Sequence, residues 1–144
     1  MATTLVENLS VQNIKKSQPV DIFTGDSFEI TDSFQDICNN INVKGCKSII
    51  LWCNYDRGDS VDMEIKALVG ADKDNVDYEF VIETISADKV EIQEEIVETG
   101  IDADFKFVRE FVLNGAINFI KFQVKDSADG TGQLDSAKVS IRTV

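Results

Sequence analysis

The chain has 144 residues, of which 43% are hydrophobic, and its formal net charge is −12 at pH 7. This composition argues against nucleic-acid binding, because the 14 Lys and Arg residues are scattered among 26 Asp and Glu residues. The same acidity disfavours an anionic membrane surface, and no apolar run approaches the roughly 20 residues that span a bilayer. We therefore expect one globular domain over residues 1–144, with neither a nucleic acid nor a membrane as partner.

The first forty residues predict short elements. Residues 1–19 predict a first strand or an N-terminal arm, and residues 20–23 and 28–30 predict short strands. Over residues 32–41 the apolar spacing fits one face of a helix, whereas the Asn residues and the strand-like surroundings favour extended structure. A single helical turn and an extended segment are both open interpretations there.

The clearest strand signals flank an Arg-Gly-Asp triplet. Residues 49–55 are apolar on both faces, which indicates a strand in the middle of a sheet with both sides covered. Residues 61–69 alternate between apolar and polar, which is typical of a half-buried strand. The residues between them, 56–60, are rich in turn formers. We therefore predict a β-hairpin with the triplet at its tip.

Further strand signals follow at spacings of about ten residues, which favours an all-β fold. They cover residues 78–83, 90–93, 105–113, 117–124 and 139–142. The apolar pattern of residues 117–124 changes phase, which predicts a bulge or a strand that bends between sheets. Together these signals predict a single antiparallel β-sandwich, jelly-roll or Ig-like, with about eight to ten strands.

The cysteines and the absence of histidine limit the chemistry. The chain has Cys38, Cys46 and Cys53 but no His, and its first residues lack the basic and apolar regions of a secretory signal. An odd number of cysteines without such a signal predicts reduced thiols. Because a zinc site, a Ser-His-Asp triad and a Cys-His pair all lack their residues, we expect no enzyme and no resident cofactor.

The Arg-Gly-Asp triplet invites two interpretations. Arg57 and Asp59 at a hairpin tip, beside Tyr55, would form a small binding surface, and the tripeptide is known as an integrin-binding signal. However, Asp and Gly suit a tight turn on backbone grounds alone. We favour the turn and keep Arg57, Asp59 and Tyr55 as binding candidates.

An acidic loop offers a candidate calcium site. Asp72, Asp74 and Asp77 follow one another at short spacing, and calcium is bound by carboxylate oxygens. The pattern fails as an EF-hand, because the sixth position holds Asp77 where that loop requires Gly. What remains is a looser loop site with these three residues as ligands.

Three aromatic residues are candidates for a carbohydrate-binding face. They are Trp52, Tyr55 and Tyr78. Trp52 lies in the most apolar predicted strand, so we expect it in the core.

Two stretches of the chain carry a resemblance to a known class of protein. The first comprises Leu51-Trp52-Cys53-Asn54-Tyr55, Gly58, Met63-Glu64-Ile65-Lys66 and Tyr78-x-Phe80. The second comprises Phe119-Ile120-Lys121-Phe122-Gln123-Val124-Lys125, Gly130-Thr131-Gly132 and Ala137-Lys138-Val139-Ser140-Ile141. Over roughly residues 45–144 the chain resembles small β-sandwich virion structural proteins of tailed bacteriophages.

The resemblance implies a non-enzymatic virion structural protein, most closely a capsid decoration or head auxiliary component, with a tail-associated component as the other option. Such a protein would assemble in the host cytoplasm with other virion proteins of the capsid or tail, and as a homo-oligomer. The alternative is a carbohydrate- or calcium-binding β-sandwich module used in attachment.

Overall fold

The computed structural model describes residues 2–14, 18–56, 58, 62–86, 89–92, 95–98, 105–126 and 130–143. In chain order its strands are β1 Thr4–Leu5, β2 Val20–Asp21, β3 Phe23–Thr24, β4 Phe28–Glu29, β5 Gln35–Asp36, β6 Ile41–Asn42, β7 Cys46–Asp56, β8 Asp62–Gly70, β9 Tyr78–Ser86, β10 Lys89–Ile92, β11 Glu95–Glu98, β12 Phe105–Val112, β13 Phe119–Asp126 and β14 Gln133–Thr143. Eight of these fourteen strands are longer than two residues. No helix occurs in these ranges, and so none that could cross a membrane. The predicted all-β fold is confirmed.

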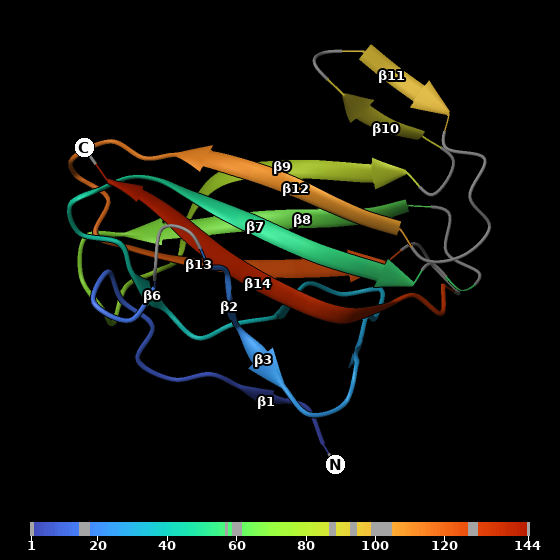
Figure 1. Cartoon of the computed structure of the whole chain (residues 1–144), viewed down its shortest axis with the longest axis horizontal. Coiled ribbons are helices and arrows are strands. Elements are labelled where there is room, and N and C mark those ends of the chain that lie inside the picture. Colours follow the sequence, from blue (N-terminus) through green and yellow to red (C-terminus); the bar gives the residue numbers. More distant parts are fainter. Residues whose placement is uncertain are drawn as a thin grey trace.

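Two five-stranded sheets form the sandwich. The β7 sheet has the order β12-β7-β14-β2, and β4 also pairs with β14; the β8 sheet has the order β5-β13-β8-β9, and β6 also pairs with β13. Every strand pair within them is antiparallel. The β7 sheet lies in front of the β8 sheet in Figure 1. Two separate pairs, β1–β3 and β10–β11, complete the described strands.

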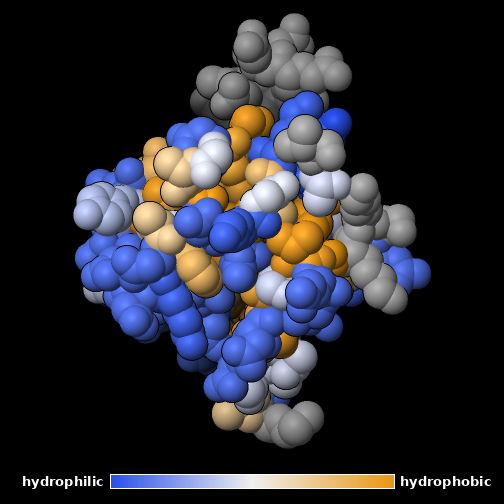
Figure 2. Space-filling view, turned by 90° about the vertical axis from the view of Figure 1, so that its left-hand side faces the viewer, coloured by the Kyte–Doolittle hydropathy of each residue, from blue (hydrophilic) through white to orange (hydrophobic). Residues whose placement is uncertain are grey.

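The core lies between the two sheets and is built by alternate residues of their long strands. The fully buried side chains include Ile49, Leu51, Tyr55, Met63, Ile65, Ile120, Phe122 and Leu134. The rings of Phe111 on β12 and Phe122 on β13 meet across the sandwich, with centroids 5.1 Å apart. Viewed from the end where the C-terminus lies, hydrophobic residues show as a band between hydrophilic ones (Figure 2). This burial is the main driving force that the sequence supplies for the fold.

The predicted hairpin around the Arg-Gly-Asp triplet is wrong. β7 pairs with β12 and β14, whereas β8 pairs with β13 and β9, so the two strands belong to opposite sheets. A tight hairpin turn between Asp56, the last residue of β7, and Asp62, the first of β8, is therefore not what the strand pairing shows. Gly58, which the structure describes between these two residues, has a φ of 56° and lies against Thr131, where a side chain would collide.

The predicted bulge in residues 117–124 is also wrong. β13 begins at Phe119 and alternates regularly between half-buried and buried residues, and it pairs with β8 without a register shift. Ile117 precedes the strand and belongs to a turn, so the apparent change of phase joins two different elements. A register shift occurs instead between Ala67 and Leu68, in the pairing of β8 with β9.

The N-terminal third packs along the sandwich as extended segments. Residues 32–41 contain β5 and the first residue of β6, so the extended interpretation holds and no helical turn forms there. Before them, β1 pairs with β3, and the Leu9 carbonyl accepts a hydrogen bond from the backbone N–H of Asn42 at 2.9 Å. Leu9 and Ile14 are buried, which attaches residues 2–14 to the core.

Candidate functional site

An exposed apolar surface lies on the outer face of the β7 sheet, which Figure 1 turns toward the viewer. Strand pairing places Val108, Trp52 and Lys138 side by side across β12, β7 and β14. Trp52 points outward because its neighbours Leu51 and Cys53 fill the core, and it is 39% exposed. We call this surface the Trp52 face; it comprises Ile50, Trp52, Val108, Glu110, Val112, Lys138, Ser140 and Arg142.

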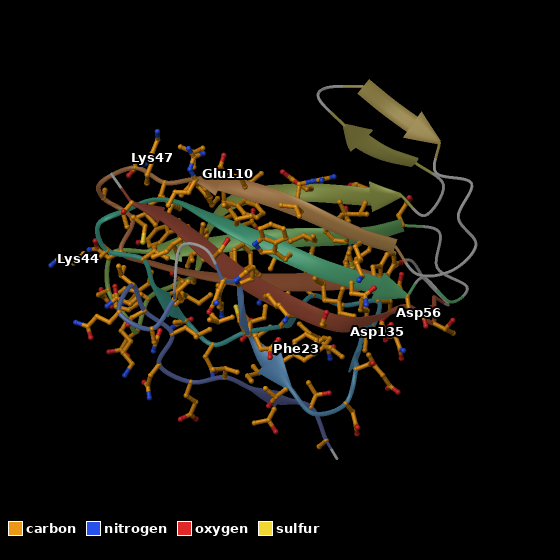
Figure 3. All side chains as sticks on the ribbon, in the orientation of Figure 1. Phe23, Lys44, Lys47, Asp56, Glu110 and Asp135 are labelled. Carbon is orange, nitrogen blue, oxygen red and sulfur yellow. The ribbon has the colours of Figure 1, made fainter. Side chains whose placement is uncertain are left out.

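The polar groups of the Trp52 face bond within the chain, to one another or to neighbouring residues. The indole Nε1 of Trp52 donates to Ser140 Oγ at 2.9 Å. The carboxylate of Glu110, labelled in Figure 3, accepts a bond of 2.7 Å from Ser48 Oγ and one of 3.1 Å from Arg142 Nη1. These two bonds and the guanidinium charge lower the pKa of the Glu110 carboxyl below its usual value. What the face offers to a partner is therefore chiefly its apolar side chains.

The expectation that Trp52 belongs to the core is wrong. β7 is central in its sheet, as predicted, but in the part of the chain that the structure describes only its inner face is covered at this point. Val108 and Val112 on β12 are 43% and 63% exposed, so the apolar surface continues beyond Trp52. This face could not be predicted from the sequence, because residues 49–55 are apolar on both sides. The strand therefore lacks the apolar–polar alternation that distinguishes a buried face from an exposed one.

The structure contradicts one of the three binding candidates at the Arg-Gly-Asp segment. Tyr55 is fully buried in the core, because it shares the inner face of β7 with Leu51, so it is withdrawn as a binding residue. Arg57 and Asp59 lie outside the described residues. The neighbouring Asp56 lies at the end of β7 (Figure 3) and accepts a bond from the backbone N–H of Gly58 at 3.2 Å.

The predicted calcium site is not formed either. One carboxylate, that of Asp72, accepts bonds from the backbone N–H of Asp74 at 3.0 Å and from Asn75 Nδ2 at 2.9 Å. Among the described residues no cluster of three or more acidic, Cys or His side chains could hold a metal, and Asp77 joins none. The acidic spacing instead builds a capped turn between β8 and β9.

Tyr78, the third aromatic candidate, stands apart from the Trp52 face. It begins β9 in the β8 sheet, pairs with Val69 and is 68% exposed. The register shift in this strand pair interrupts the alternation of Tyr78, Phe80 and Ile82 that the sequence suggested. The alternation in the sequence is therefore no basis for a continuous aromatic surface formed by these side chains.

A second surface feature is an open groove of about 960 Å³ beside the N-terminal segment. Its walls come from residues 7–13, residues 36–42, Lys73 and the start of β13. The lining includes Asn8, Asn13, Asn39, Asn40, Asn42 and Phe119. The sequence gives no sign of this groove, because its segments are far apart in the chain and none carries a recognisable motif.

The amides of this groove are partly engaged with the backbone. Asn13 Nδ2 donates to the Asn8 carbonyl at 2.7 Å, Asn40 Nδ2 to the Lys73 carbonyl at 2.8 Å, and Asn39 Nδ2 to the Val6 carbonyl at 3.3 Å. The Oδ1 atoms of Asn39 and Asn40 and the whole side-chain amide of Asn8 make no hydrogen bond within the described ranges. These groups can therefore form hydrogen bonds to a ligand.

No protein-family model and no curated protein sequence matches the chain. Among solved structures it is similar to the insecticidal delta-endotoxin Cry8Ea1 from Bacillus thuringiensis, with a TM-score of 0.46 and 13% identity over 81% of this chain. It is also similar to a carbohydrate-binding module, CBM6cm-2, of lichenase 5A from Cellvibrio mixtus, solved with cellotriose. That comparison has a TM-score of 0.43 and 12% identity over 96% of this chain and 95% of the module. The chain spans 20% of the endotoxin, and neither likeness carries an argument about function.

Proposed function

We propose that this chain is a non-enzymatic virion structural protein, a capsid decoration or head auxiliary component, that assembles through the Trp52 face. The observation that carries the proposal is the exposure of Trp52, Val108 and Val112 on one rigid sheet. Protein interfaces are enriched in exposed Trp and depleted of unpaired charge at their centres, and this face has both properties. The sequence resemblance to phage virion proteins supplies the biological setting; the structural neighbours do not support it.

A second copy of the chain is the partner that the charge distribution favours. A net charge of −12 makes most contacts between two copies repulsive. On the Trp52 face, Glu110 is paired with Arg142 at 3.1 Å and Lys138 lies 3.8 Å from Asp21. Two copies that meet through this face therefore bring together compensated charges and apolar side chains, which fits a symmetric homo-oligomer.

The proposed role in a virion is tested on purified virus particles. Virions purified by density gradient from the source of the chain are digested and analysed by mass spectrometry. We expect peptides of this chain at a stoichiometry comparable to that of other structural proteins. Their absence from purified particles would contradict a virion role.

Carbohydrate binding is retained as a second candidate function because of the amide-lined groove. Its residues are not the aromatic ones that the sequence suggested, since Tyr55 is buried. The groove uses residues of the N-terminal segment and of the β8 sheet, so it is separate from the Trp52 face. Both surfaces could serve one attachment component, one for assembly and one for a ligand.

A further inference from the structure

We propose that the groove between residues 7–13 and 36–42 binds a neutral oligosaccharide. This inference deepens the second candidate function and does not depend on assembly through the Trp52 face. Four properties of the groove support it: a fixed shape, unused amide groups, an aromatic wall and balanced charge.

The groove is held in shape by backbone bonds. The N-terminal segment is fixed to the sandwich where the Leu9 carbonyl accepts from the Asn42 N–H at 2.9 Å, and Ser10 forms a parallel bridge with Asn42. The opposite wall is fixed where the Ile37 N–H donates to the Phe122 carbonyl at 3.0 Å. A preformed groove spares a ligand the cost of ordering the chain.

The polar lining matches hydroxyl groups. An Asn side chain offers an acceptor oxygen and two N–H donors, and a sugar hydroxyl both donates and accepts. Asn39 and Asn40 present free acceptor oxygens, and Asn8 presents a complete exposed amide among the described residues. Asn8 adopts a φ of 60°, a conformation that Asn tolerates better than most residues. Several such groups in one groove favour a polyhydroxylated ligand.

The apolar wall and the charges of the groove limit the class of ligand that it can bind. Phe119 and Lys121 point outward from β13, and Phe119 is half-buried beside Asn42, its partner on β6. A ring in this position can pack against the C–H face of a pyranose. The charged lining residues are Glu7, Asp36, Lys73 and Lys121, two of each sign, and Lys121 lies 3.3 Å from Asp36. Balanced charge favours an uncharged ligand, and about 960 Å³ exceeds what a single sugar ring requires.

The test begins with a printed panel of neutral and charged oligosaccharides, followed by calorimetric titration with the strongest neutral binder. Asn8→Gly removes one amide and keeps the positive φ without strain. Phe119→Leu removes the ring and keeps an apolar side chain. We expect each variant to weaken binding by about three- to tenfold, with an unchanged unfolding temperature.

Trp52→Ser is the matched control, because it alters the outer face of the opposite sheet. We expect it to bind the oligosaccharide with wild-type affinity even if it loses self-association. Trp52 is the only tryptophan, so its fluorescence should not respond when the groove is filled. No binding across the panel, selective binding of charged glycans, or affinity unchanged in both groove variants would overturn the proposal.

Discussion

The indole of Trp52 donates its N–H to the hydroxyl of Ser140 at 2.9 Å, from the outer face of β7 to the outer face of β14. Ser140 is almost fully buried although it faces outward, whereas the residue Trp52 is 39% exposed. The polar atom of the side chain is thus satisfied within the chain, and the apolar ring remains available. Because the ring stays accessible, it can take part in the proposed self-association through the Trp52 face.

The two sheets are joined at one edge by an ion pair whose strength can be measured. Arg109 Nε on β12 lies 2.8 Å from Glu83 Oε2 on β9, and both side chains are largely shielded from water. We expect a double-mutant cycle with Glu83→Gln and Arg109→Gln to give a coupling energy of about 1 kcal/mol in urea unfolding.

The more exposed pair of Lys138 and Asp21, 3.8 Å apart, is the matched control. For this pair the double-mutant cycle should give a coupling energy of less than about 0.5 kcal/mol, because solvent screens the charges. Equal coupling in the two pairs would refute a special role for the pair that bridges the sheets.

A glycine at the end of β8 is predicted to be sensitive to a single methyl group. A Cβ on Gly70 would collide with the backbone carbonyl of Asn75, so one of the two segments must shift. We expect Gly70→Ala to lower the free energy of unfolding by about 1–3 kcal/mol, as overpacking does elsewhere.

Gly115→Ala provides the comparison, since a Cβ there meets no heavy atom within 4 Å. This substitution should change the free energy of unfolding by no more than about 0.5 kcal/mol. If thermal or urea unfolding gave the two variants the same stability, the crowding inferred at Gly70 would be incorrect.

Glu110 should make stability depend on pH. The hydrogen bond from Ser48, and then that from Arg142, lower its pKa below 4.5, so the folded state binds its proton less readily than the unfolded state. The resulting stabilisation is fully present well above pH 4.5 and is lost as the pH falls through the folded-state pKa.

We therefore compare the wild type with Glu110→Gln by urea unfolding at about pH 7 and about pH 3. The wild type should be the more stable of the two at the higher pH only. A difference of equal size at both pH values would show that the charge of Glu110 is not involved.

The buried thiols should be unreactive in the folded protein. Burial raises the pKa of Cys38 and of Cys53 to about 12, and in Cys38 the N–H of Phe122 opposes that shift only in part. At about pH 8 the reactive thiolate is therefore scarce as well as inaccessible.

Labelling with a thiol-specific chromogenic disulfide should proceed slowly in buffer and rapidly at all three cysteines in denaturant. Cys46, which keeps 8% of its surface exposed, should be the first to react without denaturant. Fast modification of Cys38 or Cys53 in the native protein would contradict the burial described here.

Sequence patterns were most informative where the signal is local. The alternation in residues 61–69 predicted a half-buried strand, because every second side chain must face the core. The same alternation does not encode which strand will be the neighbour. β7 and β8 were therefore expected to pair as a hairpin, although they belong to opposite sheets.

The candidate sites were harder to predict for two physical reasons. Trp52 lies on a strand with two apolar faces, so its outward direction depends on what the other sheet covers. The groove brings residues 7–13 beside residues 36–42 and Phe119, and such proximity depends on tertiary packing. In contrast, the acidic pattern around Asp72 is visible in the sequence, but in the structure Asp72 caps a turn and forms no calcium site among the described residues.

Self-association through the Trp52 face is the central claim, and light scattering after size exclusion tests it most directly. The wild type, Trp52→Ser and Val112→Glu are compared, with Tyr78→Ser as a control that removes an exposed aromatic residue from the other sheet. We predict that the wild type and Tyr78→Ser have a mass that is a defined multiple of 16.0 kDa, and that the two Trp52-face variants shift toward the monomer while remaining folded. A wild type that stays monomeric at all concentrations, or an oligomer that both Trp52-face variants leave intact, would contradict it.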